Sequence, residues 1–116
     1  MGSGAKRKLD VRFYRSASGS EPVREWLKTL SRSAMQEIGS DIQRVQWRWP
    51  VSKPLVDGLR GGLFEVRTKL ENVQYRVLFC IKDSTMVLLH GFVKKVRTAQ
   101  GEIAIGRDRK KDVEKE

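Results

Sequence analysis

Two very short connections between three long extended segments constrain the fold more than any other feature. Residues 63–69 and 73–82 alternate apolar and polar side chains and are joined through Leu70-Glu71-Asn72. Asp83-Ser84 then leads into a third extended segment, residues 85–93. Connections this short join neighbouring antiparallel strands. The sequence therefore predicts an antiparallel meander over residues 63–93.

The first half of the chain predicts one strand and two helices. Residues 9–15 alternate as a strand does, and residues 33–49 repeat apolar residues at helical spacing. Between them lies a first helical stripe, formed by Val23, Trp26, Leu27 and Leu30. The second stripe is formed by Met35, Ile38, Ile42, Val45 and Trp49. We expect Ser20 to cap the first helix and Ser33, with Gln36, to form a capping box for the second. Gly39 inside the second helix indicates close packing there.

Residues 100–115 predict a final, more charged helix, which gives the element order β-α-α-β-β-β-α. This order predicts an α+β fold, in which an N-terminal helical hairpin covers one face of a small four-stranded, mainly antiparallel sheet, followed by a C-terminal helix. A chain of 116 residues, 39% of them apolar, is expected to form one domain. We assign residues 9–116 to that domain and residues 1–8 to a disordered leader or a cloning remnant.

Alternation along the strands divides their side chains between two faces of the sheet. An apolar row is expected to pack against the helical hairpin; it consists of Val73, Tyr75, Val77, Phe79 and Ile81. Arg76 falls on the opposite row, and Arg67 falls on the matching row of the preceding strand. Arg67 and Arg76 are therefore expected to share the sheet face that points away from the two helices.

The net charge of +10 indicates an anionic partner, with nucleic acid or the ribosome as the main class. A basic face that keeps the protein in solution or meets an acidic protein is the alternative. Residues 58–98 hold eight Lys or Arg and three Asp or Glu, a net +5, whereas residues 99–116 balance to zero. One cysteine, Cys80, and the absence of a long apolar run predict a cytoplasmic protein with no membrane association.

The basic side chains of the predicted sheet could cleave RNA without a metal. RNA carries its own nucleophile, so a protein must aim the 2′-oxygen, move protons and stabilise charge on the phosphoryl oxygens. Arginine binds two phosphate oxygens at once, and a lysine among other cations can transfer a proton. The candidate catalytic residues are Arg67, Arg76, Lys94 and Lys95. The candidate RNA-binding residues are Arg60, Lys69, Lys82 and Arg97. The alternative is that these side chains only grip a nucleic-acid backbone.

Other kinds of site receive less support from the sequence. His90 is the single histidine and lies in an apolar segment, on the same expected strand face as Met86, Leu88 and Phe92. A structural role is therefore favoured over that of a general base. One histidine and one cysteine do not make up the ligand set of an ordinary zinc site, and no phosphate-cradling glycine motif is present. We expect no cofactor and no metal.

The stretch from Gly58 to Lys95 resembles the RelE/ParE superfamily of bacterial toxins, and within it the HigB-like, phage-associated branch. The resemblance lies in Gly-Leu-Arg-Gly-Gly-Leu-Phe-Glu-Val-Arg67, Tyr-Arg76-Val-Leu-Phe and His-Gly-Phe-Val-Lys-Lys95. It implies the toxin of a type II toxin–antitoxin pair, which cleaves mRNA on the ribosome without metal. It also implies a helix-turn-helix antitoxin as partner, with DNA contacted only through that antitoxin. The chain has no tyrosine after Tyr75 to match one that some members use in catalysis. Either Lys94 or Lys95 is the general base, or the activity is weak.

Two other functions fit the same fold, because a fold alone does not determine function. A ParE-like inhibitor of DNA gyrase would bind a protein rather than strain a phosphodiester. A non-catalytic nucleic-acid-binding module would show salt-sensitive binding without cleavage.

Overall fold

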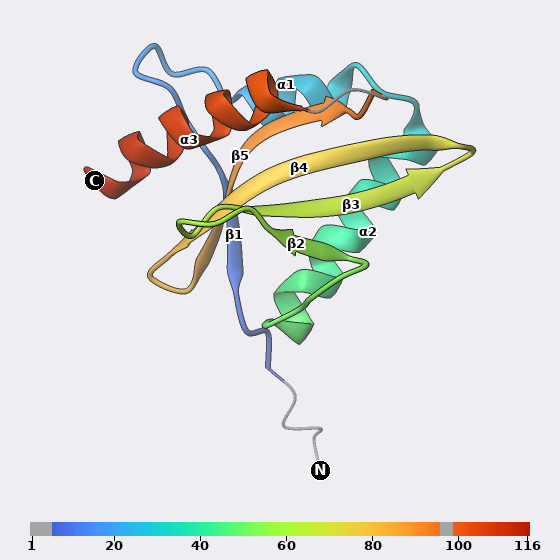
Figure 1. The fold of residues 1–116 in the computed structure, drawn as a ribbon, viewed down its shortest axis with the longest axis horizontal. Helices are drawn as coiled ribbons and strands as arrows, with labels where there is room; N and C mark the ends of the chain where they lie inside the picture. Colours follow the sequence, from blue (N-terminus) through green and yellow to red (C-terminus); the bar gives the residue numbers. More distant parts are fainter. Residues whose placement is uncertain (1–5, 96–98) are drawn as a thin grey trace.

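The computed structural model describes residues 6–95 and 99–116, which form three helices and a five-stranded sheet (Figure 1). In chain order the elements are β1 (Asp10–Phe13), α1 (Pro22–Lys28), α2 (Arg32–Arg48), β2 (Val56–Gly58), β3 (Phe64–Leu70), β4 (Val73–Lys82), β5 (Thr85–Val93) and α3 (Gln100–Glu114). The α+β class is confirmed. In the described part of the chain, no helix has the length and apolarity required to cross a membrane. Residues 1–5 of the predicted leader lie outside the described residues, and the Lys8 amide donates to the Gln46 carbonyl.

The sheet has the strand order β1-β5-β4-β3-β2, with β1 parallel to β5 and every other pair antiparallel. The prediction of four strands missed β2, which pairs with the first half of β3 at the sheet edge. This strand has only three residues, too few to produce a recognisable alternation. The meander itself is confirmed, and β4 and β5 have the predicted bounds.

The two meander turns adopt a backbone that suits tight hairpins. Glu71 and Asn72 have φ of 51° and 68°, and Asp83 and Ser84 have φ of 52° and 60°. Two successive residues with positive φ are typical of the type I′ turn, whose twist matches that of the flanking strands. The turn chemistry therefore fixes the register that places the side chains of β3 opposite those of β4.

Helices cover both faces of the sheet, whereas the sequence placed only the helical hairpin, on one face. Helices α1 and α2 close one core, in which Ile38 and Val45 pack against Val77 and Phe79. Helix α3 closes a second core on the other face, which contains Leu63, Leu78, Cys80, Val87, Leu89 and Val113. The close approach of α3 requires Gly106, because a Cβ there would lie 2.6 Å from Leu78 Cδ1.

Several local expectations for the helices are wrong. Ser31, not Ser33, caps α2 by accepting from the Ala34 amide, and Glu21 rather than Ser20 precedes α1. Met35 is 40% exposed, while Ala34 takes the buried position beside it. Gly39 faces open space and does not mark close packing. The cause of the cap error is the short loop, in which two serines are equally suitable by type.

A bulge in β5 changes the faces of its second half. Leu78 pairs with His90 whereas Phe79 pairs with Leu88, so Leu89 is an extra residue on β5. Such an insertion reverses the alternation of side chains beyond it. His90 and Phe92 consequently face α3, while Met86 and Leu88 face α1 and α2. The prediction that all four share one face is wrong for this reason.

Candidate nucleic-acid interface

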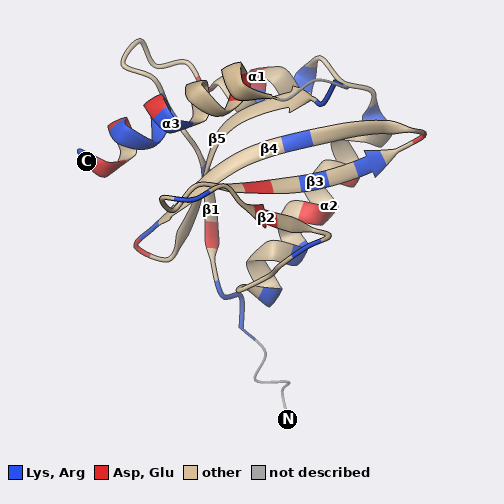
Figure 2. Cartoon of the chain, viewed as in Figure 1, with Lys and Arg blue, Asp and Glu red and all other residues tan. Residues whose placement is uncertain are grey.

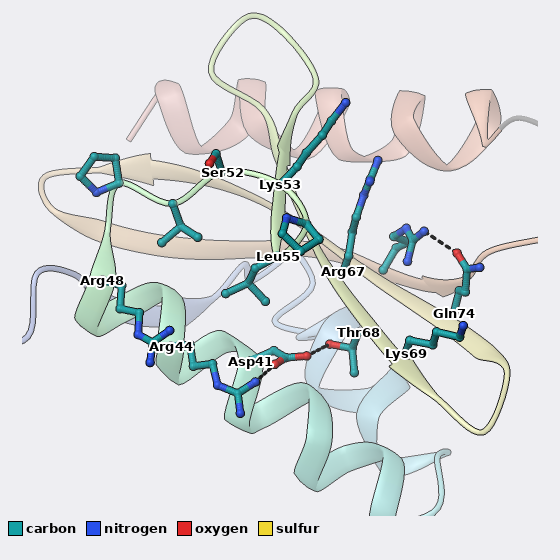
Figure 3. Close-up of a pocket in the computed structure, with 14 residues that line it drawn as sticks. Asp41, Arg44, Arg48, Ser52, Lys53, Leu55, Arg67, Thr68, Lys69 and Gln74 are labelled. Carbon is teal, nitrogen blue, oxygen red and sulfur yellow. Dashed lines mark hydrogen bonds and ion pairs between the residues drawn. The ribbon is translucent and has the colours of Figure 1, made fainter.

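An open groove of about 1070 Å³ lies where α2, residues 50–55 and the ends of β3 and β4 meet (Figure 3). Its lining includes six basic side chains, Arg44, Arg48, Lys53, Arg67, Lys69 and Arg76. Asp41 is the one acidic residue among the described lining residues. A concave surface with this excess of cations attracts anionic ligands and concentrates them.

Arg67 and Arg76 lie directly opposite each other on neighbouring strands. The β3–β4 register pairs the two residues, and both side chains line the groove. Figure 2 shows basic positions side by side on β3 and β4, and the β3 sequence places Lys69 two residues after Arg67. The expected convergence of these two arginines on one sheet face is therefore present in the structure.

Two carboxylates that are not among the predicted site residues, Asp57 and Glu65, hold the arginines in place. Arg67 Nη2 donates to Asp57 Oδ2 at 2.8 Å. Glu65 lies between the arginines, with Oε1 3.0 Å from Arg76 Nε and Oε2 3.7 Å from Arg67 Nε. These are ion pairs without hydrogen-bond alignment, because neither Nε has a hydrogen-bond partner among the described residues. A buried carboxylate that does not line the groove thus lies between its two arginines.

The two arginines differ in exposure. The Arg67 side chain is 32% exposed, whereas that of Arg76 is 7% exposed. Burial lowers the pKa of Arg76 below its usual value, and the nearby Glu65 carboxylate opposes this shift. Arg76 Nη2 donates to Gln74 Oε1 at 2.6 Å and Nη1 to the Tyr75 carbonyl at 3.2 Å. Arg67 is therefore the one available to a ligand, and Arg76 positions Glu65 and Gln74.

Asp41 ties the helical wall of the groove to the sheet. It is buried in α2, and its Oδ2 accepts from Thr68 Oγ1 at 2.7 Å while Oδ1 accepts from Arg44 Nη1 at 2.6 Å. A buried carboxylate is stable when its oxygens are satisfied in this way. Asp41 therefore fixes the position of Arg44 relative to β3.

A phage-derived family matches this chain. The model of the family described as "Phage derived protein Gp49-like (DUF891)" matches residues 25–111. The chain belongs to this family. The Gp49-like family is a HigB-like toxin family with the RelE/ParE fold, which confirms the resemblance at the level of the family. No curated protein matches the chain.

The Gp49-like match spans the groove and a second hollow beside it. That hollow, of about 370 Å³, is lined by Asn72, Val73, Gln74, Val93, Lys94 and Lys95. Lys94 and Lys95 are thus not in the same hollow as the arginines. The Lys94 amide donates to the Gln74 carbonyl, and Gln74 lines both hollows. The two predicted pairs of catalytic residues therefore flank Gln74.

The predicted RNA-binding residues are dispersed. Lys69 lines the groove, but Arg60 lies in the β2–β3 turn, where its carbonyl accepts from Arg107. Lys82 is at the far end of β4, and its ammonium group donates to the carbonyls of Val113 and Glu116 at the end of α3. Arg97 lies outside the described residues. In place of Arg60 and Lys82, the structure brings Arg44, Arg48 and Lys53 to the groove.

His90 belongs to the packing of α3 on the sheet. Its Nε2 lies 2.7 Å from Glu102 Oε1, Arg109 contacts its Nδ1, and its ring stacks on Phe92. These contacts fit the structural role favoured from the sequence. No group of three or more His, Cys, Asp and Glu side chains suited to a metal occurs among residues 6–95 and 99–116.

Proposed function

We propose that this protein is the toxin of a type II toxin–antitoxin pair and cleaves translated mRNA on the ribosome without a metal ion. Membership of the Gp49-like family supports the toxin class. The observation that carries the chemistry is the register pairing of Arg67 with Arg76 in a groove lined by six cations. In this proposal the protein acts in the cytoplasm, and a helix-turn-helix antitoxin encoded beside it is its partner and its only route to DNA.

Arg67 is proposed to contact the scissile phosphate. In the reaction, the 2′-hydroxyl gives its proton to a general base while its oxygen attacks the adjacent phosphorus, and the 5′-oxygen takes up a proton as its bond to phosphorus breaks. Negative charge grows on the phosphoryl oxygens in the transition state. A guanidinium already fixed by Asp57 stabilises that charge with little reorganisation. Arg76 is buried beside Arg67 and is proposed to position the site without contacting the phosphate, because it pairs with Glu65 and donates to Gln74.

Proton transfer has two candidate sources in this arrangement. Lys94 and Lys95 are the expected general base, and Gln74 connects their hollow to the groove. Glu65 is the alternative, because its carboxylate faces both arginines. A general base must come within hydrogen-bond reach of the 2′-hydroxyl in the complex. The pH profiles of Lys94→Ala, Lys95→Ala and Glu65→Gln distinguish these candidates.

Controlled expression tests the function. Induction of the wild-type protein should stop growth and translation and leave cuts at defined positions within translated messages. Arg67→Ala should abolish both effects at equal protein level, with Arg32→Ala, on the exposed start of α2, as the matched control. Uncut messages during growth arrest by the wild-type protein would refute the proposal, and arrest by Arg67→Ala would refute the site.

A non-catalytic nucleic-acid-binding module is the second candidate, and one observation favours it. Both arginines are already compensated by Asp57 and Glu65, as expected for residues that shape a binding surface. This candidate predicts salt-sensitive binding to ribosomes or RNA and no cleavage on programmed ribosomes. A supercoiling assay with purified gyrase tests the third possibility in the same preparation.

A further inference from the structure

The helical wall of the groove carries two cations that face the same way. Arg44 and Arg48 are four residues apart on α2, and residues at this spacing share one side of a helix. Both line the groove, and Figure 3 shows both side chains on its α2 side. The Arg44 side chain is 51% exposed although Asp41 fixes its position. This wall therefore presents two guanidinium groups to solvent, of which Asp41 holds that of Arg44.

A second pair of cations lies on the opposite wall. Asp57 contacts both, with Oδ2 accepting from Arg67 Nη2 at 2.8 Å and Oδ1 lying 3.7 Å from Lys53 Nζ. Lys53 is 67% exposed, twice as much as Arg67. Figure 3 shows the Lys53 and Arg67 side chains extending in the same direction from neighbouring segments. A chain of phosphates that reaches Arg67 would therefore pass Lys53.

Apolar side chains lie among these cations. The groove is also lined by Pro50, Val51, Pro54 and Leu55, and Figure 3 shows Leu55 between the arginines of α2 and Arg67. The faces of unpaired bases can pack against such surfaces, whereas a duplex keeps its base faces stacked inside. Cations on both walls of the groove, with apolar residues between them, therefore suit a single nucleic-acid strand better than a duplex.

We infer that Arg48 and Lys53, together with Arg44, bind the backbone phosphates of a single RNA strand on either side of the Arg67 contact, while Val51 and Leu55 contact its bases. This inference rests on the proposed function, because it assigns the substrate path of the same groove. It extends the site from the strands β3 and β4 to α2 and residues 50–55. These residues bind the strand and take no part in bond cleavage.

Salt-dependent binding tests the inference with the full chain. The probe is a fluorescein-labelled 2′-O-methyl RNA single strand, which lacks the attacking hydroxyl and stays intact. Its affinity is measured by fluorescence anisotropy over a range of salt concentrations. The variant is Arg48→Gln with Lys53→Gln, which leaves Arg44 to satisfy Asp41. Arg32→Gln with Lys28→Gln removes two charges outside the groove as the matched control.

The expected result is a smaller salt dependence for the groove variant only. Each lost phosphate contact should reduce the slope of log K against log salt by about 0.7, so the double variant should lose about 1.4. An unchanged slope, or an equal change in the control pair, would overturn the phosphate contacts. Circular dichroism and the melting temperature check that both variants are folded.

Two further probes test the single-strand and base contacts. The same sequence as a duplex, and an abasic strand of equal length, should both bind more weakly than the single strand. Equal binding of either probe would overturn the corresponding part of the inference. Cleavage on programmed ribosomes is measured beside these assays. Uncut mRNA with intact strand binding rejects the proposed function alone, whereas cleavage with unchanged binding by the groove variant rejects this inference alone.

Discussion

The cations of the groove and the cations around α3 belong to the same residue types but have different surroundings. Around α3, two of them donate to backbone carbonyls, Arg109 to that of Leu89 at 2.8 Å and Lys82 to those of Val113 and Glu116, whereas Lys110 pairs with Glu114. In the groove, Arg44 and Lys53 pair with carboxylates yet stay more than half exposed. A cation that is hydrogen-bonded to a backbone carbonyl is not free to bind a ligand. A cation in a partly solvated ion pair can exchange its carboxylate for a ligand that binds more strongly.

The strongest test of this comparison is Arg67→Ala. Loss of one preorganised charge-stabilising group typically lowers kcat by about 10²–10³. We expect a loss of that size in single-turnover cleavage of mRNA on programmed ribosomes. The melting temperature should change little, because Arg67 is partly exposed. Cleavage within a factor of about three of wild type would show that the groove arginines are structural, like those of α3.

Glu65→Gln tests whether the carboxylate at the centre of the arginine pair is required for folding. Glu65 and Arg76 are both buried, and removal of one partner of a buried ion pair typically costs about 3–5 kcal/mol. Glutamine keeps the shape and one acceptor, so we expect a loss of about 3 kcal/mol in urea unfolding. Glu37→Gln, at an exposed position of α2, should change stability by less than about 0.5 kcal/mol. Equal stability of the two variants would show that the Glu65–Arg76 ion pair is not required for folding.

Much of the fold follows from short-range patterns. The bounds of β4 and β5 were predicted because alternation and two tight turns are local signals. The missing β2 and the bulge at Leu89 depend on pairing with other strands, and no local pattern encodes that pairing. The face assignment of His90 was wrong for the same reason, since one extra residue reverses all positions after it.

The groove was only half predictable. Alternation predicts that Arg67 and Arg76 share one sheet face, but it does not predict that they pair directly. Arg48 and Lys53 reach the groove from segments that the charge count of residues 58–98 left out. Arg44 and Arg48 do carry one local signal, their four-residue spacing on a helix. Lys82 contributed to that charge count but is bound to the end of α3. Net charge in a sequence window therefore does not show which cations remain available.

Arg109→Ala tests the other half of the comparison, in which a cation serves only to hold α3. Its guanidinium donates to the Leu89 carbonyl, contacts His90 and lies 5.7 Å from the centre of the Tyr14 ring. Hydrogen bonds to charged groups typically contribute about 1.5–3 kcal/mol. We therefore expect the free energy of unfolding of Arg109→Ala to be about 2 kcal/mol lower than that of wild type. Cleavage per folded molecule should be unchanged at a temperature where the variant is folded. A loss of cleavage like that of Arg67→Ala would show that α3 contributes to the site.

Tyr14→Phe should have the smallest effect on the free energy of unfolding. That effect should depend on pH, which tests the contact between Tyr14 and α3. The Tyr14 hydroxyl donates to Asp112 Oδ2 at 2.6 Å, and this carboxylate, followed by burial, raises the Tyr14 pKa above its usual 10.0. Loss of this hydrogen bond should cost about 1 kcal/mol at neutral pH. Because the folded pKa is the higher one, the unfolded chain loses its proton first as pH rises. The stabilisation is thus present below pH about 10 and decreases as the pH rises through the folded pKa.

The measurement for Tyr14→Phe is urea unfolding of both proteins at pH 7 and at several pH values above about 10. The difference in stability between wild type and variant should shrink over that upper range. Asp112→Asn is the control, because asparagine keeps an acceptor for the hydroxyl but removes the charge that raises the pKa. In that background the folded pKa lies closer to 10, so the decrease should begin at the same pH but be smaller and end at a lower pH. A difference that stays near zero at every pH would mean that the hydroxyl makes no net contribution to the attachment of α3, which would then depend on the Arg109 contacts and the packing around Leu78 and Val113.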